Sequence, residues 1–137
     1  MVEISIAYEG GLRCSAVHGP SGTSIQTDAP VDNHGQGAAF SPTDLAATSL
    51  GVCMMTVMGI VAKSRGIELC GTRLIVKKHM SQHPPRRIAA VDVDLFLPIP
   101  TDHPDRGLLE KSGRECPVAL SLHPDVKQSI TFHWGVE

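Results

Sequence analysis

The chain has few aromatic side chains and little net charge. Aromatic residues make up 4% of its 137 residues, and the formal net charge is −2. Aliphatic side chains and methionine must therefore fill the core, and a hydrophobic content of 42% is enough to build one. Acidic and basic residues are interspersed, which argues against the clustered basic stripe of a nucleic-acid surface. We expect no nucleic-acid partner.

The N-terminus lacks the pattern of a secretion signal. Its first ten residues, MVEISIAYEG, alternate between apolar and polar instead of joining a basic region to an apolar stretch. We therefore expect a cytoplasmic protein. In that compartment the four cysteines are expected to be free, catalytic or metal-bound before they form structural disulfides.

Long uncharged runs are also scarce, and the one that stands out is LAATSLGVCMMTVMGIVA, residues 45–62. Its length reaches the lower limit for crossing a bilayer. Threonine, serine and glycine keep its hydrophobicity moderate, and the surrounding sequence is typical of amphipathic strands. We interpret the run as a buried helix and expect no membrane partner.

Strong boundary signals frame this helix. Ser41 suits the N-cap, Pro42 the first helical position, and Asp44 the acidic place of a capping box. Lys63 and Arg65 follow in the last turn, where cations favour the helix dipole, and Gly66 provides a stop.

The remaining segments predict a single α+β domain over residues 1–137. Three short alternating strands, VEISIAY, LRCSAVH and TSIQT, precede the helix and suit an antiparallel meander. Two strands in ELCGTRLIVKKHM and AAVDVDLFLP follow it, then a helix near residues 103–112, a short helix in VALSL and a last strand, VKQSITFHW. A central helix that is apolar on every side needs more cover than one chain provides, which favours a symmetric homodimer.

Cys53 and Cys116 are the candidate reactive thiols. Cys53 lies mid-helix, where a free cysteine is usually a small core residue and the helix dipole offers little help. Cys116 precedes Pro117 at the expected start of a short helix, where unpaired N–H groups favour a thiolate. Together they could form a dithiol that reduces a peroxide through a sulfenic acid and a disulfide. Met54, Met55 and Met58 could supply apolar walls or simply fill the core.

Two stretches carry a family resemblance. SPTDLAATSLGVC resembles the helix-opening signature of the OsmC/Ohr family, and ECPVALSLHPDVKQSITFHW resembles its second signature, a C-P-V helix followed by a final strand. The resemblance implies an intertwined homodimer with two interface sites. It also implies a thiol-dependent peroxidase that reduces organic hydroperoxides, uses an external thiol reductant and needs no cofactor. By motif position, Cys53 would be the peroxidatic thiol and Cys116 the resolving one.

The chain departs from this family at one important place. The best-characterised hydroperoxide branch has a glutamate ten positions before the first cysteine, which orients an arginine over the thiolate. This sequence has Thr43 there, with the shorter acid Asp44 next to it, and Arg13 is the natural candidate for the arginine. A non-catalytic module that binds a small hydrophobic ligand, or a redox sensor, therefore remains an alternative.

The other cysteines and the histidines match no site pattern. Cys14 and Cys70 fall in strand patterns and are interpreted as core or face residues. His79 and His83 have a ligand-like gap, but no second pair has a finger-like spacing. We expect no metal.

Overall fold

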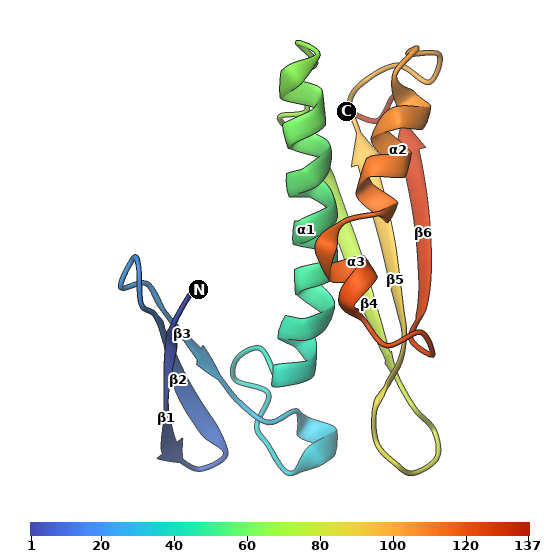
Figure 1. Ribbon diagram of the computed structural model, residues 1–137. Helices are drawn as coiled ribbons and strands as arrows, with labels where there is room; N and C mark the ends of the chain where they lie inside the picture. The colour runs from blue at the N-terminus through green and yellow to red at the C-terminus, as the bar shows by residue number, and fades with distance from the viewer. The chain divides into compact units, whose positions relative to one another are not determined.

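The structure is a computed structural model that describes residues 1–137. The chain forms two compact units, Met1–Ala46 and Ala47–Glu137. The long helix α1 (Pro42–Ser64) begins in the first unit and continues through the second (Figure 1).

The N-terminal unit contains the predicted antiparallel meander. Its strands β1 (Ile4–Gly10), β2 (Arg13–His18) and β3 (Ser24–Thr27) pair in the order β1-β2-β3. A short 3₁₀ turn, η1 (Val31–Asn33), lies within the loop that leads to α1. Because Cys14 pairs with Thr27, the β2–β3 register directs Arg13 toward the residue that follows β3.

The start of α1 is a capping box, as the sequence predicts. The Ser41 backbone N–H donates to Asp44 Oδ2 at 2.9 Å, and the Asp44 N–H donates to Ser41 Oγ at 3.0 Å. The helix ends at Ser64, and Gly66 then adopts a positive φ of 67°.

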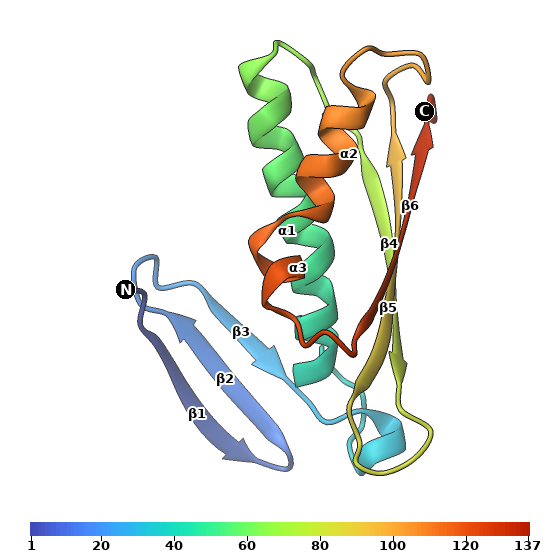
Figure 2. The ribbon, with the colours of Figure 1, turned by 45° about the vertical axis from the view of Figure 1, so that its right-hand side comes forward.

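The C-terminal unit is a three-stranded sheet covered by helices on one face. Strands β4 (Arg73–Met80), β5 (Ile88–Leu97) and β6 (Lys127–Trp134) lie in the order β4-β5-β6. β4 and β5 are antiparallel, whereas β5 and β6 are parallel because α2 (Arg106–Arg114) and α3 (Pro117–Ser121) lie between them in the chain. Figures 1 and 2 show α1, α2 and α3 on the same face of this sheet.

The core lies between the sheet and the helices. The predicted inward side chains of β5, which are Val91, Val93, Leu95 and Leu97, are all at most 1% exposed. They share one hydrophobic cluster with Leu50, Met54 and Met58 of α1. Burial at every second strand position fixes which face of the sheet the helices cover.

Two expected boundaries shift in the structure. The predicted strand from Glu68 begins only at Arg73, because a turn forms first: the Thr72 N–H donates to Leu69 O, and Gly71 has a φ of 91°. Cys70 therefore lies exposed in a turn and not in a strand. The helix expected near residues 103–112 begins at Arg106 and ends at Arg114.

Within this chain α1 is covered on one side only. Val52 and Ile60, eight residues apart on the helix, are 60% and 66% exposed. By length and composition α1 could span a membrane, and 33% of its most apolar 18-residue window is buried in the protein. The uncovered stripe of α1 is the part of this unit that calls for a partner surface.

Candidate functional site

Cys53 and Cys116 come together in the C-terminal unit although 63 positions separate them in the chain. Cys53 lies on α1 and is partly exposed, whereas Cys116 is fully buried at the N-cap of α3. The two thiols are neighbours, close enough for Cys53 to raise the pKa of Cys116. Both thiols are free.

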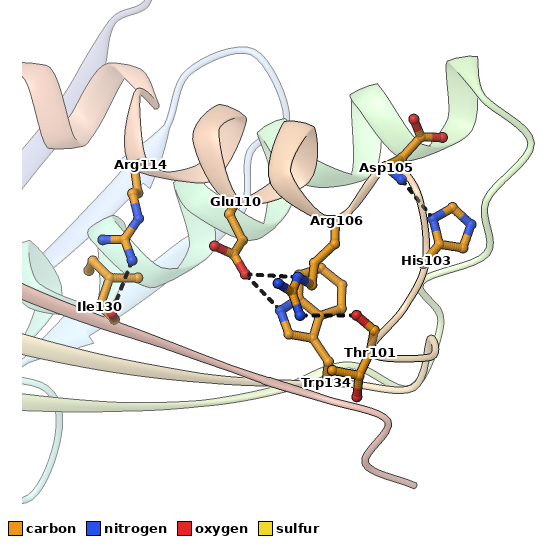
Figure 3. A network of polar contacts seen from close by, with 8 residues as sticks. All are labelled: Thr101, His103, Asp105, Arg106, Glu110, Arg114, Ile130 and Trp134. Carbon is orange, nitrogen blue, oxygen red and sulfur yellow. Dashed lines mark hydrogen bonds and ion pairs between the residues drawn. The ribbon is translucent and has the colours of Figure 1, made fainter.

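A polar network holds α2, and thereby the residues that follow it, against β6 (Figure 3). Trp134 Nε1 donates to Glu110 Oε1 at 2.8 Å, and Arg114 Nη2 donates to Ile130 O at 3.3 Å. The Cys116 backbone N–H in turn donates to Gly113 O at 3.2 Å, at the end of α2. The register of α2 on β6 therefore determines where Cys116 lies.

A glycine lets α2 approach α1. A Cβ at Gly113 would lie 2.9 Å from Met58 Sδ, closer than side-chain atoms normally come. Gly51, in the segment that contains Cys53, plays the same part against β4, since its Cβ would lie 2.8 Å from Val76 Cγ2. Close packing on both sides of α1 fixes the helix that carries Cys53.

Burial sets the protonation of Cys116. Its position at the start of α3 is as predicted, and its Sγ accepts a hydrogen bond from the Ala119 N–H at 3.4 Å. Desolvation nevertheless outweighs this contact and raises the pKa of Cys116, and the neighbouring Cys53 thiol raises it further. The thiolate expected at this helix start is therefore disfavoured, which corrects the expectation drawn from helix-end electrostatics alone.

The methionines near Cys53 divide between two roles. Met54 and Met58 are fully buried and fill the core. Met55 instead borders an open, largely apolar hollow of about 330 Å³ between α1 and β4. Only Met55 of the three is therefore placed to contact a ligand outside the core.

Arg13 is anchored within the N-terminal unit. Its Nη2 donates to Gln36 Oε1 at 3.0 Å and lies 3.7 Å from Asp28 Oδ2. Thr43, at the place of the family glutamate, contacts Ser41 through its hydroxyl at 3.2 Å, and Asp44 serves the capping box.

Asp28 and Gln36, the two partners of Arg13, were not predicted from the sequence. Both belong to a loop whose acids look alike in sequence, and burial alone distinguishes Asp28 from the exposed Asp32. The β2–β3 register pairs Cys14 with Thr27 and so places Arg13 opposite Asp28. That register was the one signal that could have identified Asp28.

The histidines and remaining cysteines lie elsewhere. His79 and His133 form contacts with Asp92 and Asp94 at 2.7 and 2.8 Å. No three His, Cys, Asp or Glu side chains converge in a way that could hold a metal ion. Cys14 is partly buried in β2 and Cys70 is exposed.

Comparison with known proteins places this geometry in a family. The model of the OsmC-like protein family matches residues 35–131, and no curated protein sequence matches the chain. A crystal structure from Psychrobacter arcticus 273-4, provisionally named an osmotic stress induced and detoxification response protein, is 43% identical. It aligns over 97% of this chain and 96% of its own, with a TM-score of 0.91.

Two organic hydroperoxide resistance proteins share the fold at low identity. The protein from Legionella pneumophila is 14% identical and covers 97% of this chain and 96% of its own, with a TM-score of 0.76. The protein from Elizabethkingia anophelis is 18% identical and covers 97% and 95%, also with a TM-score of 0.76. With the family model matching most of its length, the chain belongs to the OsmC-like protein family.

Proposed function

We propose that this protein is a thiol-dependent peroxidase that reduces organic hydroperoxides through Cys53 and Cys116. The observation that carries the proposal is the pair of free, neighbouring thiols in an OsmC-like chain. The printed names of two proteins with this fold, as organic hydroperoxide resistance proteins, support the substrate class.

The proposed cycle has three balanced steps. The Cys53 thiolate attacks the distal oxygen of R–OOH, the O–O bond breaks, and the alkoxide takes a proton and leaves as R–OH while Cys53 becomes a sulfenic acid. The Cys116 thiol then attacks the sulfenic sulfur, which forms the disulfide and releases water. An external dithiol reduces this disulfide by thiol–disulfide exchange and is itself oxidised.

The surroundings of the two thiols support this division of roles. The attacking sulfur must reach the substrate, and Cys53 is the partly exposed member of the pair. Cys116 is fully buried and burial raises its pKa, so it keeps its proton more readily than an ordinary cysteine. A buried, protonated neighbour suits the resolving role, in which the thiol reacts only after the sulfenic acid forms.

Arg13 is the proposed cation of the reaction. A guanidinium stabilises a thiolate and polarises the peroxide without taking up or losing a proton. The assignment rests on the family resemblance and on the anchoring of Arg13 by Gln36 and Asp28.

We further propose that the working form is a homodimer. Val52, Thr56 and Ile60 recur at every fourth position of α1 and form an exposed stripe. The apolar hollow between α1 and β4 opens beside the first two of them. A second copy of the same stripe would bury both surfaces in a symmetric interface.

Consumption of cumene hydroperoxide by the reduced protein in a stopped-flow instrument tests the function. We expect fast reaction of the parent and of the control Cys70→Ser, whose thiol is exposed in a turn. Cys53→Ser should abolish the reaction. Cys116→Ser should still react once and leave a sulfenic acid that dimedone traps.

Retention of the parent rate by Cys53→Ser would overturn the thiol assignment. An unreactive parent that carries a bound apolar ligand would favour the alternative, a non-catalytic binding module in which the dithiol is structural.

A further inference from the structure

Asp28 is a buried carboxylate with one oxygen unused. Its side chain is 1% exposed, and Oδ2 accepts the Ala38 backbone N–H at 3.0 Å, whereas Oδ1 has no hydrogen-bond partner. Burial of an ionised carboxylate is costly unless charge or hydrogen bonds compensate for it. A buried polar atom without a partner is uncommon and calls for a physical explanation.

The loop that carries Asp28 closes tightly around the carboxylate. The Gly37 N–H donates to Ala29 O at 3.2 Å, and the Gly35 N–H donates to Pro30 O at 3.0 Å. A Cβ at Gly35 would overlap the Ala29 carbonyl, so only glycine fits there. Backbone N–H groups, that of Ala38 foremost, lower the pKa of Asp28 against the opposing effect of burial, and Arg13 lowers it further. The carboxylate is therefore fixed in position and charged at neutral pH.

Arg13 is the cation that this carboxylate faces. Its guanidinium lies 3.7 Å from Asp28 Oδ2 and donates to Gln36 Oε1 at 3.0 Å. A small cavity of about 40 Å³ is bordered by both Arg13 and Asp28. A guanidinium has five N–H donors in a rigid fork, so it can donate to Gln36 and face the Asp28 carboxylate at the same time.

We propose that Asp28 is the positioning residue for Arg13, the task for which the hydroperoxide branch of the family uses a glutamate at the place of Thr43. Gln36 holds the guanidinium from the other side. This inference rests on the proposed function, since it assumes that Arg13 serves the reaction of Cys53. The orientation of Arg13 by Asp28 can nevertheless be tested apart from the reaction. Its physical advantage is that a cation that is already oriented need not be ordered when the peroxide binds.

A double-mutant cycle tests the inference through the reaction rate. Asp28→Asn keeps the shape and an oxygen for the Ala38 N–H but removes the charge. We expect it to lower the rate constant of Cys53 oxidation by about tenfold in the parent and by less than about twofold when Arg13 is already glutamine, because the effect passes through Arg13. The control Glu9→Gln removes an exposed acid that also borders Arg13 and should change the rate by less than about twofold.

A second variant covers the case in which Asp28→Asn does not fold. Gln36 lies on the exposed side of the loop. Gln36→Ala should slow the reaction about twofold to fivefold. In the Arg13→Gln background, Gln36→Ala should leave the rate unchanged. Equal effects with and without Arg13, or a Glu9→Gln effect as large as that of Asp28→Asn, would overturn the proposal.

A spectroscopic readout separates this inference from the proposed function. In protein labelled with ¹⁵N-arginine, the Arg13 Nη groups should rotate slowly in the parent and freely in Asp28→Asn, whose melting profile shows whether it is folded. An unreactive parent with a restrained Arg13 would refute the peroxidase and leave the positioning intact. An Arg13 signal that Asp28→Asn does not change would refute the positioning whatever the activity.

Discussion

The proposed division of roles between the two thiols depends on how differently the fold surrounds them. Cys116 is sealed in the core at the end of the α2–α3 segment, and Cys53 lies on the partly exposed side of α1. Position at a helix start favours a thiolate, but loss of hydration disfavours it more strongly here. The local backbone therefore sets where Cys116 lies, and burial sets its charge.

This difference predicts the pH dependence of alkylation. Because burial raises the pKa of Cys116, its thiolate fraction at neutral pH is below that of an ordinary cysteine. We expect iodoacetamide to modify Cys116 last of the four cysteines, at a rate that rises only at alkaline pH. Peptide mass spectrometry over a pH series measures this order, and preferential labelling of Cys116 at pH 7 would contradict it.

The raised pKa of Cys116 also makes the stability of the fold depend on pH. The unfolded chain loses this proton at a lower pH than the folded chain does. The buried thiol therefore favours folding below its ordinary titration range, and that contribution is lost as the pH rises through the folded-state value.

Individual residues show how far the sequence could be interpreted alone. Cys53 and Cys116 could be chosen as candidates because they match motif positions, and Arg13 because it follows the first hairpin. Asp28 could not be chosen, because its burial results from the β2–β3 register and from a loop closed around Gly35. Asp28 and Asp32 are both aspartates of the same loop, and only the tertiary structure shows that Asp28 is buried and Asp32 is exposed.

At the scale of elements, the approach of α2 to α1 depends on the absence of a side chain at Gly113. Gly113→Ala should lower the free energy of unfolding by about 1–3 kcal/mol, because the added methyl group overpacks against Met58. The matched control is Gly107→Ala in the same helix, where an added Cβ meets nothing within 4 Å. It should leave stability unchanged or raise it by up to about 1 kcal/mol.

Urea unfolding monitored by circular dichroism measures both variants. Equal stability of Gly113→Ala and Gly107→Ala would show that the helices do not pack as closely as described.

The capping box at the start of α1 gives a second test at this scale. Ser41→Ala removes the acceptor of the Asp44 N–H and should cost about 0.5–2 kcal/mol of stability. Thermal unfolding beside the control Ser24→Ala, on exposed β3, measures the loss. A melting temperature of Ser41→Ala no lower than that of the control would contradict the capping role.

Elements with strong local signals were predictable. The cap and stop of α1 and the alternation of β5 both appear in the structure as expected. The start of β4 was not, because residues 68–72 have strand-like composition but form hydrogen-bonded turns. Local propensity cannot show that the backbone N–H groups of such a segment will form hydrogen bonds within a turn and not with a neighbouring strand.

At the scale of the whole molecule, the exposed stripe of α1 predicts self-association. Val52→Lys should disrupt the proposed homodimer by burying an unpaired charge in the interface. The control Ile75→Lys also replaces an exposed aliphatic side chain by lysine. Ile75 lies in β4 on the other face of the sheet, opposite Asp94.

Sedimentation equilibrium of both variants measures the result. We expect a monomer for Val52→Lys and a dimer for Ile75→Lys and the parent. A monomeric parent would refute the homodimer, which the sequence suggested through the excess of apolar surface on one helix and through the family resemblance.

The central claim is that the thiols of Cys53 and Cys116 exchange oxidation state, and the most direct measurement is a disulfide map after one equivalent of cumene hydroperoxide. We predict a peptide that links Cys53 to Cys116 within one chain, formed with loss of both free thiols and reversed by a dithiol. Unmodified thiols at these two positions, or a disulfide that uses Cys14 or Cys70 instead, would contradict the account.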